Sequence, residues 1–408
     1  MKNWVRQSGR DLDLQLLAAM LLLCLAGVAM VYSATQIDQP GLSGLWTRQL
    51  LWVGIGLAVM AVFAAVPFRY FEALAWPFYL GTLALLVLVL FAPAQAKAHR
   101  WFSLGSFNLQ PSELAKIAAA FIIARTLTGR ALARHPALRV AAASALALGP
   151  MALVLVEPDL GTAMCFPAML LGMLFWARVP IKTLFFMLSP FLSVLAVVSM
   201  PSWVVFMAVL VAAFWFFRTR FRLAAPLFLL NAAIGSLAPL LWNNLREYQQ
   251  RRILIFINPG LDPKGAGWHV LQSKIAIGSG GLFGKGFLEG TQKKLSFLPA
   301  QQTDFIFSAI GEELGFLGCL TVILLFGWLI YRGLLIAQQA RNGFASLTVV
   351  GLLSVLTFHL VLNVGMTLGL MPVTGIPLPF LSYGGSAVIA MMAMVGIVLN
   401  VGLRRYEY

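Results

Sequence analysis

The chain is built from long apolar runs separated by short polar loops. Many runs reach roughly 20 residues, the length at which a helix crosses a hydrocarbon core about 30 Å thick. Hydrophobic residues make up 60% of the 408 residues and charged residues only 11%, whereas soluble proteins carry about 25% charged residues. The alternating segments of about 10 residues that a transmembrane β-barrel needs are absent. The sequence therefore predicts an all-α, polytopic integral membrane protein.

The apolar runs predict about twelve transmembrane helices in a single membrane domain that spans residues 1–408. The first run, from Leu16 to Ala34, follows a basic start but is too long for a cleaved signal, so we expect it to be retained. The seventh and eighth runs are separated almost only by Pro201, and they form either a hairpin or a broken helix. The predicted ranges are 15–34, 49–66, 74–93, 112–127, 138–156, 160–177, 182–199, 202–217, 223–242, 305–331, 345–370 and 385–403.

Lys and Arg residues collect in alternate loops. Counted from the N-terminus, these loops hold 17 of the 29 Lys and Arg residues, and short cytoplasmic loops are enriched in both types. We therefore expect both termini to be cytoplasmic. The net charge of +15 does not indicate a nucleic-acid partner, because the basic residues form no basic helix and no patch interleaved with aromatic residues.

The segment 243–304 departs from this charge rule. It is the one long, polar, glycine-rich segment of the chain, and on the helix count it is a large extracytoplasmic loop. Long loops cross the membrane largely regardless of charge, so its cations predict an anionic ligand, with attraction to lipid headgroups as the alternative. The eight basic residues are Arg246, Arg251, Arg252, Lys264, Lys274, Lys285, Lys293 and Lys294.

The run from Gly278 to Gly286 resembles a phosphate loop but does not fit the Walker pattern. Ser279 stands where its first glycine belongs, and Gly286 stands where Ser or Thr follows the lysine. We therefore do not expect ATP binding. Backbone amides of the run, together with Lys274 and Lys285, are a candidate cradle for a phosphate or pyrophosphate. No metal site is predicted, because the His and Cys residues are scattered.

Acidic residues within or beside the apolar runs are candidates for chemistry, since an ionisable group in a span costs roughly 2.5–3.5 kcal/mol and needs a partner. Glu113 and Lys116 lie three residues apart on one helix face, where they form either an internal ion pair or a ligand site. Glu157 and Asp159 flank Pro158 in a tight outer turn, and Asp159 is also a candidate N-cap. Asp304 precedes the tenth helix, as an N-cap or as a general base.

The last outer loop, residues 371–386, contains three prolines and three glycines and cannot be a plain helix. Irregular backbone at membrane depth occurs only where protein or a water-filled cavity covers it. We therefore expect this loop, with Ser382 and Tyr383, to line the same cavity as the segment 243–304.

Taken together, these stretches resemble the SEDS family (shape, elongation, division and sporulation) of membrane glycosyltransferases. The resemblance extends in order over most of the chain, although the family core has ten helices and this chain carries an extra pair near 182–217. Residues 371–379 are more similar to the elongation branch than to the division branch. The matching motifs are Arg100-Trp101, residues 110–116, 157–162, 262–267, 272–281 and 284–286, Thr303 to Phe307, and residues 377–386.

This resemblance implies a bacterial inner-membrane enzyme that polymerises lipid II into peptidoglycan glycan strands during elongation. It makes Asp304 the catalytic base for the acceptor hydroxyl, and it implies a class B penicillin-binding protein, a transpeptidase, as partner. No cofactor is assigned, and a divalent cation is left open. The implied substrate-binding residues are Arg100, Glu113, Lys116, Glu157, Asp159, Lys274, Lys285, Ser382 and Tyr383, and cations among them are candidates for stabilising the pyrophosphate leaving group.

Two readings from other functional classes remain open. A lipid II flippase or transporter fits a bundle of about twelve helices with buried charged residues. A membrane scaffold for cell-wall enzymes fits the same composition. Within the family, a division-type polymerase is the alternative to the elongation type.

Overall fold

The computed structural model describes residues 12–36, 44–92, 100–105, 107–130, 132, 134–197, 199–244, 250, 255, 266–291 and 301–404. The chain forms two compact units. The main unit comprises residues 1–173 and 255–408, and the small unit comprises residues 174–254. Each unit is described separately below.

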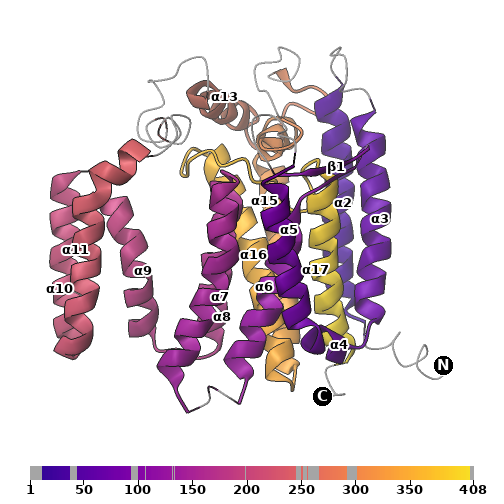
Figure 1. The fold of residues 1–408 in the computed structure, drawn as a ribbon. Helices are drawn as coiled ribbons and strands as arrows, with labels where there is room; N and C mark the ends of the chain where they lie inside the picture. Colours follow the sequence, from indigo (N-terminus) through magenta and orange to yellow (C-terminus); the bar gives the residue numbers. More distant parts are fainter. Residues whose placement is uncertain are drawn as a thin grey trace. The chain divides into compact units, whose positions relative to one another are not determined.

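Most described residues of the main unit lie in helices (Figure 1). Each of the twelve predicted ranges in the chain overlaps a long helix of described residues. The helices of the main unit are α2 (Leu14–Thr35), α3 (Leu45–Ala65), α4 (Phe68–Ala73), α5 (Ala75–Val89), α6 (Pro111–Thr128), α7 (Pro136–Val156), α13 (Ala266–Ser279), α15 (Ile306–Gln339), α16 (Gly343–Thr367) and α17 (Gly385–Leu403), and α8 (Leu160–Trp176) begins there.

Helices α6, α16 and α17 form the centre of the main unit. Most residues along each of them are buried, and the three helices pack against one another. The alanines of α6, among them the run Ala118–Ala120, are fully buried, and small residues let helix backbones approach closely in membrane proteins. Helix α17 also packs along α3, and α15 packs along α2 (Figure 1).

The C-terminal ends of the neighbouring helices α3 and α17 are joined by buried polar contacts. Asn400 of α17 donates hydrogen bonds to the carbonyls of Phe63 and Ala64 at 2.7 and 3.1 Å, and Arg404 donates to Ala64 and Ala65 at 3.1 and 2.7 Å. These carbonyls belong to the last turn of α3, where helical carbonyls lack intrahelical donors. The two side chains therefore cap α3 from the neighbouring helix.

Three features depart from the sequence-based expectation. A two-stranded antiparallel hairpin, β1 (Phe102–Leu104) with β2 (Phe107–Leu109), precedes α6, with Ser103 paired to Asn108. The segment predicted as a long loop contains helix α13. Helix α15 is interrupted at Gly315, whose backbone is left-handed with φ of 68°, so its first part, residues 306–314, is a separate short helix.

The small unit contains α9 (Ile181–Ala196), α10 (Met200–Phe216) and α11 (Phe221–Asn244). Its core is aromatic: Phe186 is stacked on Phe214 with ring centroids 5.0 Å apart. Buried polar groups cross-link its helices, since Asn231 donates to Ser189 Oγ at 3.1 Å. The structure thus gives the pair near 182–217 two separate helices, α9 and α10.

Six of the described helices, α2, α3, α7, α15, α16 and α17, are long and apolar enough to cross a membrane. Five further apolar helices, α5, α8, α9, α10 and α11, are shorter by the same measure. The all-α architecture predicted from the sequence is confirmed apart from the small hairpin. The count of twelve crossings stays a prediction.

Candidate functional site

Asp304 lies in a turn, half-buried, immediately before α15. The N-cap residue of α15 is Phe305, so the N-cap alternative raised for Asp304 is wrong. Gly375 of the irregular loop lies beside the Asp304 carboxylate: a Cβ at Gly375 would sit 3.4 Å from Asp304 Oδ2. Gly375 also has φ of 74°, a conformation that glycine adopts at no steric cost.

The backbone on either side of Asp304 is held by the loop of residues 377–383. Ser382 Oγ donates to the carbonyl of Thr303 at 2.5 Å, and the Tyr383 N–H donates to the carbonyl of Gln302 at 2.9 Å. Ser382 Oγ also accepts from the Leu378 N–H at 2.8 Å, and Ser382 is only 2% exposed. These contacts give Ser382 and the Tyr383 backbone a structural role, and their predicted contact with substrate stays a prediction.

Arg100, Glu157 and Asp159 come together at the turn between α7 and α8. Arg100 Nε donates to the Glu157 carbonyl at 3.1 Å, and its guanidinium also donates to the Pro158 carbonyl. Arg100 lies 3.9 Å from Asp159 Oδ2. Asp159 accepts from the Thr162 N–H at 3.2 Å and from Thr162 Oγ1 at 3.0 Å, which is the N-cap pattern. Asp159 therefore caps α8 and also faces Arg100.

Glu157 is fully buried, and neither of its carboxylate oxygens has a hydrogen-bond partner among the described residues. Burial, reinforced by the Asp159 carboxylate and opposed by Arg100, raises the pKa of Glu157 from 4.5 to about 8. A buried carboxyl without donors favours its neutral form. Glu157 is therefore a protonated carboxyl group in the turn, beside the Asp159 carboxylate.

Glu113 and Lys116 form the ion pair that their spacing predicts. Lys116 Nζ lies 2.8 Å from Glu113 Oε1, and Lys116 is fully buried. His359 of α16 lies 3.0 Å from Lys116 Nζ through its Nε2, and its Nδ1 lies 3.3 Å from the Pro377 carbonyl. An ammonium only donates, so Nε2 accepts and the Nδ1–H donates to Pro377. His359 was not predicted from the sequence to belong to the site, and in the structure it connects Lys116 to the Pro377 carbonyl.

Lys285 pairs with Glu312 at the start of α15, with Nζ 2.8 Å from Glu312 Oε1. The backbone N–H groups of Lys285 and Gly286 donate to the carbonyls of Glu312 and Glu313 at 3.0 and 3.1 Å. Those of Leu288 and Thr291 donate to the two carboxylates at 3.2 and 2.8 Å. The proposed phosphate cradle is therefore wrong for these amides, because α15 already occupies them.

Lys274 differs from the other candidate cations. It is exposed on α13, and no hydrogen bond or ion pair joins it to the part of the chain that the structure describes. A Cβ at Gly369, two residues after the end of α16, would lie 2.6 Å from Lys274 Nζ. The remaining basic residues of the segment 243–304, namely Arg246, Arg251, Arg252, Lys264, Lys293 and Lys294, lie outside the described residues.

The irregular loop is common to these clusters. Gly375 lies beside Asp304, and Pro377 accepts from His359. A Cβ at Gly161, in the first turn of α8, would lie 2.7 Å from Ile376 Cγ1 and 3.0 Å from Thr374 Cβ. Ser386 Oγ accepts from the Gln110 N–H at 3.3 Å. Residues from three predicted motifs, 110–116, 157–162 and 303–307, together with His359 of α16, therefore contact residues 374–386.

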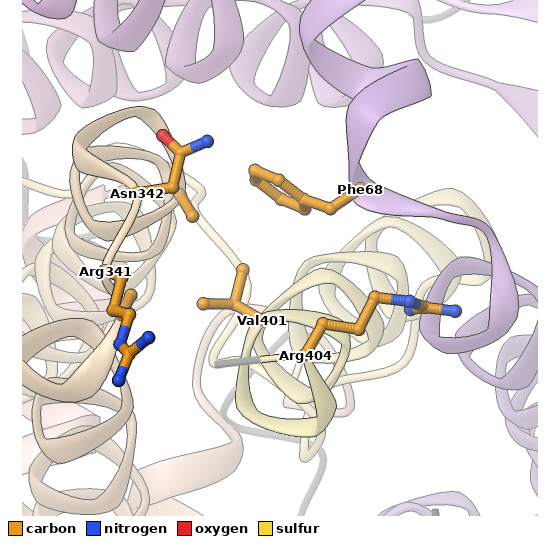
Figure 2. Close-up of a pocket in the computed structure, with 7 residues that line it drawn as sticks. Phe68, Arg341, Asn342, Val401 and Arg404 are labelled. Carbon is orange, nitrogen blue, oxygen red and sulfur yellow. The ribbon is translucent and has the colours of Figure 1, made fainter. Parts of the chain in front are cut away.

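The described residues form no metal-binding cluster, and a pocket that they enclose lies away from the predicted site residues. Among the described residues, no group of three His, Cys, Asp or Glu side chains is placed to hold a metal ion. A small pocket encloses about 220 Å³ of space, partly open solvent, at the far end of α16 and α17 from Asp304. Figure 2 shows Phe68, Asn342 and Val401 around it, with the Arg341 and Arg404 side chains directed away. It contains none of the predicted site residues.

Comparisons with known proteins show which family the chain belongs to. The model of the FtsW/RodA/SpoVE family, described as cell cycle proteins, matches residues 14–407. The chain is 36% identical over 395 residues to the peptidoglycan glycosyltransferase MrdB of Escherichia coli K12, covering 97% of this chain and 94% of that protein.

Two solved structures share the fold. The rod shape-determining protein RodA of Thermus thermophilus aligns with a TM-score of 0.65 and 28% identity, over 97% of this chain and 98% of that chain. A chain from a structure described as the coordination of polymerization and crosslinking by a peptidoglycan synthase complex aligns with a TM-score of 0.72 and 29% identity, over 97% and 99% of the two chains. The chain is a multi-pass membrane protein and belongs to the FtsW/RodA/SpoVE family.

Proposed function

We propose that this chain, a peptidoglycan glycosyltransferase of the elongation type, polymerises lipid II with Asp304 as the general base. The observation that carries the proposal is the setting of Asp304. It does not occupy the N-cap position of α15, its neighbouring carbonyls are held by the loop of residues 377–383, and a glycine lies against its carboxylate. A carboxylate held in this way is suited to accept a proton from a substrate.

In the proposed reaction, the 4-hydroxyl oxygen of the acceptor N-acetylglucosamine attacks the anomeric carbon of the donor. The new bond forms between this oxygen and the anomeric carbon, the hydroxyl proton moves to Asp304, and the bond from the anomeric carbon to the pyrophosphate oxygen breaks. The configuration at the anomeric carbon inverts, and undecaprenyl pyrophosphate leaves. General base catalysis contributes typically 10² to 10⁴-fold to such a step.

Lys274 is the best supported cation for the leaving pyrophosphate. Arg100 donates to backbone carbonyls, Lys116 is fully buried against Glu113, and Lys285 is paired with Glu312. Lys274 is exposed on α13 and has no such hydrogen bond or ion pair within the described residues. A cation directed at developing negative charge stabilises the transition state most when its donors are not already occupied.

The remaining parts of the proposal concern sidedness and partners. Positive loop charge supports cytoplasmic termini, which places Asp304 and α13 on the extracytoplasmic side of the bacterial inner membrane. The similarity to a chain from a complex that coordinates polymerization and crosslinking supports a transpeptidase partner, a class B penicillin-binding protein. Lipid II and the growing glycan strand are the proposed substrates.

A lipid II transporter is the second candidate, supported by the buried Glu113, Lys116 and His359 cluster. Purified protein in vesicles, supplied with lipid II, separates the two. We expect glycan strands on gels, a loss of about 100-fold or more in Asp304→Ala, and parental activity in Glu289→Gln, an exposed acidic control. Translocation of labelled lipid II without any polymer would contradict the proposal.

A further inference from the structure

Asn363 of α16 is a buried amide that connects two backbone segments. It is fully buried, and its Nδ2 donates to the Asp304 carbonyl at 3.0 Å and to the Ile376 carbonyl at 2.8 Å. Its Oδ1 has no hydrogen-bond partner among the described residues. A buried acceptor without a partner costs about 1–3 kcal/mol, so this arrangement reduces stability at the Oδ1 atom.

The two carbonyls belong to irregular backbone. Asp304 lies in the turn before α15, and Ile376 lies in the loop that follows α16. Neither carbonyl has a place in a helix ladder, and a buried carbonyl needs a donor. Gly375, which lies beside Asp304 Oδ2, directly precedes Ile376. The Asn363 amide therefore links the backbone of Asp304 to the turn that contacts its carboxylate.

Three successive carbonyls are held in this way. The carbonyl of Gln302 accepts from Tyr383, that of Thr303 accepts from Ser382, and that of Asp304 accepts from Asn363. The first two donors come from the loop of residues 377–383 and the third comes from α16. Of these three donors, Asn363 is the one that bonds the residue carrying the carboxylate, and it also donates to the Ile376 carbonyl of the facing turn.

We infer that Asn363 is a positioning residue that orients Asp304 for proton transfer, an inference that rests on the proposed function. The chemistry of the side chain is specific. A neutral side chain with two N–H groups on one nitrogen satisfies two carbonyls at once. Asp has no donor when ionised, Ala has none, and Ser supplies a single donor on a shorter side chain.

The chain contains a matched control in Asn400 of α17. Asn400 is also fully buried, its Nδ2 also donates to the carbonyls of Phe63 and Ala64, and its Oδ1 also lacks a partner among the described residues. Its carbonyl partners lie at the C-terminal end of α3, far along the bundle from the N-terminal end of α15. The two asparagines therefore carry similar structural roles, and only one of them contacts Asp304.

The test measures kcat and KM for lipid II polymerisation with Asn363→Ala, Asn363→Ser, Asn400→Ala and Asp304→Asn, each expressed per folded molecule, together with apparent melting temperatures. We expect Asn363→Ala to lower kcat about 100-fold, because misplacement of a reacting group by about 1 Å costs that much, with KM within threefold of the parent. Asn363→Ser recovers part of the loss. Asn400→Ala lowers the melting temperature comparably and leaves kcat within threefold.

A kcat within threefold of the parent in both Asn363 variants overturns the inference, as does a loss in Asn400→Ala equal to that in Asn363→Ala. The Asp304→Asn variant separates this failure from failure of the proposed function. If Asp304→Asn is inactive while the Asn363 variants keep parental kcat, only the positioning role fails. A parental rate in Asp304→Asn removes the base and the positioning role together.

Discussion

Polar side chains inside this protein are few, and most of them are matched within the described residues. Lys116 has Glu113 and His359, and Ser33 donates to both oxygens of Glu313 at 2.6 and 2.7 Å. An apolar surrounding makes an unmatched polar group expensive, so pairs of this kind fix which helix faces meet. Glu157 is an exception, because neither of its buried carboxylate oxygens has a hydrogen-bond partner among the described residues.

Glu157 predicts a specific dependence of stability on pH. Its pKa is about 8 in the folded protein and 4.5 in the reference state, so the folded state binds its proton more tightly between these values. Stability therefore falls as the pH rises through this range. We expect the apparent melting temperature of the parent to fall between about pH 5 and pH 8.

Glu157→Gln, which imitates the protonated carboxyl, is the comparison for this effect. The apparent melting temperature of this variant should fall by a smaller amount over the same pH range, because the substituted amide has no proton to lose. Thermal unfolding in detergent at several pH values measures both proteins. Parallel curves for parent and variant would show that Glu157 does not titrate in this range.

At residue scale, contacts close in sequence were predictable and distant ones were not. The spacing of three between Glu113 and Lys116 predicts their ion pair, and the structure contains it. His359 contacts Lys116 across 243 residues, and Asn363 contacts Asp304 across 59, and no local pattern encodes such distances. One signal was available: His359 and Asn363 are polar residues four apart on one face of an apolar helix.

At the scale of elements, the glycine-rich run after α13 serves packing. Gly280 and Gly284 lie so close to α15 that a methyl group on either would overlap the carbonyls of Gly311 or Glu313. The break in α15 at Gly315 lets the run align with it, and the Phe316 N–H donates to the Gly281 carbonyl at 2.9 Å. Glycines that resemble a phosphate loop in sequence therefore allow two backbones to approach closely.

Gly284→Ala and Gly281→Ala test this account of the run. Both glycines have a positive φ, 81° and 58°, so each substitution introduces backbone strain of roughly 1–2 kcal/mol. Only Gly284 faces a backbone carbonyl, while no atom lies within 4 Å of the Cβ position at Gly281. We expect Gly284→Ala to be less stable than Gly281→Ala by about 2 kcal/mol. Equal melting temperatures would contradict the packing role.

Hydrophobicity predicted the long helices because membrane spans need length and apolar composition more than any particular contact. The hairpin β1–β2, helix α13 and the break at Gly315 were not predicted. The hairpin strands have three residues each, too few for a recognisable alternation, and α13 lies in a polar segment. The break at Gly315 depends on contacts with the glycine-rich run, which a hydropathy profile does not contain.

At the scale of the whole molecule, the positive-inside pattern predicts topology. The loop between α6 and α7 contains exposed Arg130, and Glu289 is exposed in the run that follows α13. Charge asymmetry predicts that Arg130 lies in the cytoplasm and that Glu289 lies outside. The three native cysteines, Cys24, Cys165 and Cys319, are buried. Labelling of a single introduced cysteine by a maleimide can therefore be detected in their presence.

We expect a membrane-impermeant maleimide to label Glu289→Cys in intact spheroplasts and to label Arg130→Cys only after permeabilisation. The native protein, treated in the same way, is the background control. Labelling of Arg130→Cys in intact spheroplasts, with none at Glu289→Cys, would invert the topology and place Asp304 on the cytoplasmic side.

The central claim is that the Asp304 carboxylate accepts the proton of the acceptor hydroxyl. Asp304→Asn tests it most directly, because the hydrogen bonds from Tyr383, Ser382 and Asn363 end on backbone carbonyls and do not need the carboxylate. The decisive measurement is the initial rate of lipid II polymerisation by this variant, with its melting temperature as a check of folding. The account predicts a parental melting temperature and a rate lower by about 10² to 10⁴-fold. A parental rate would contradict it.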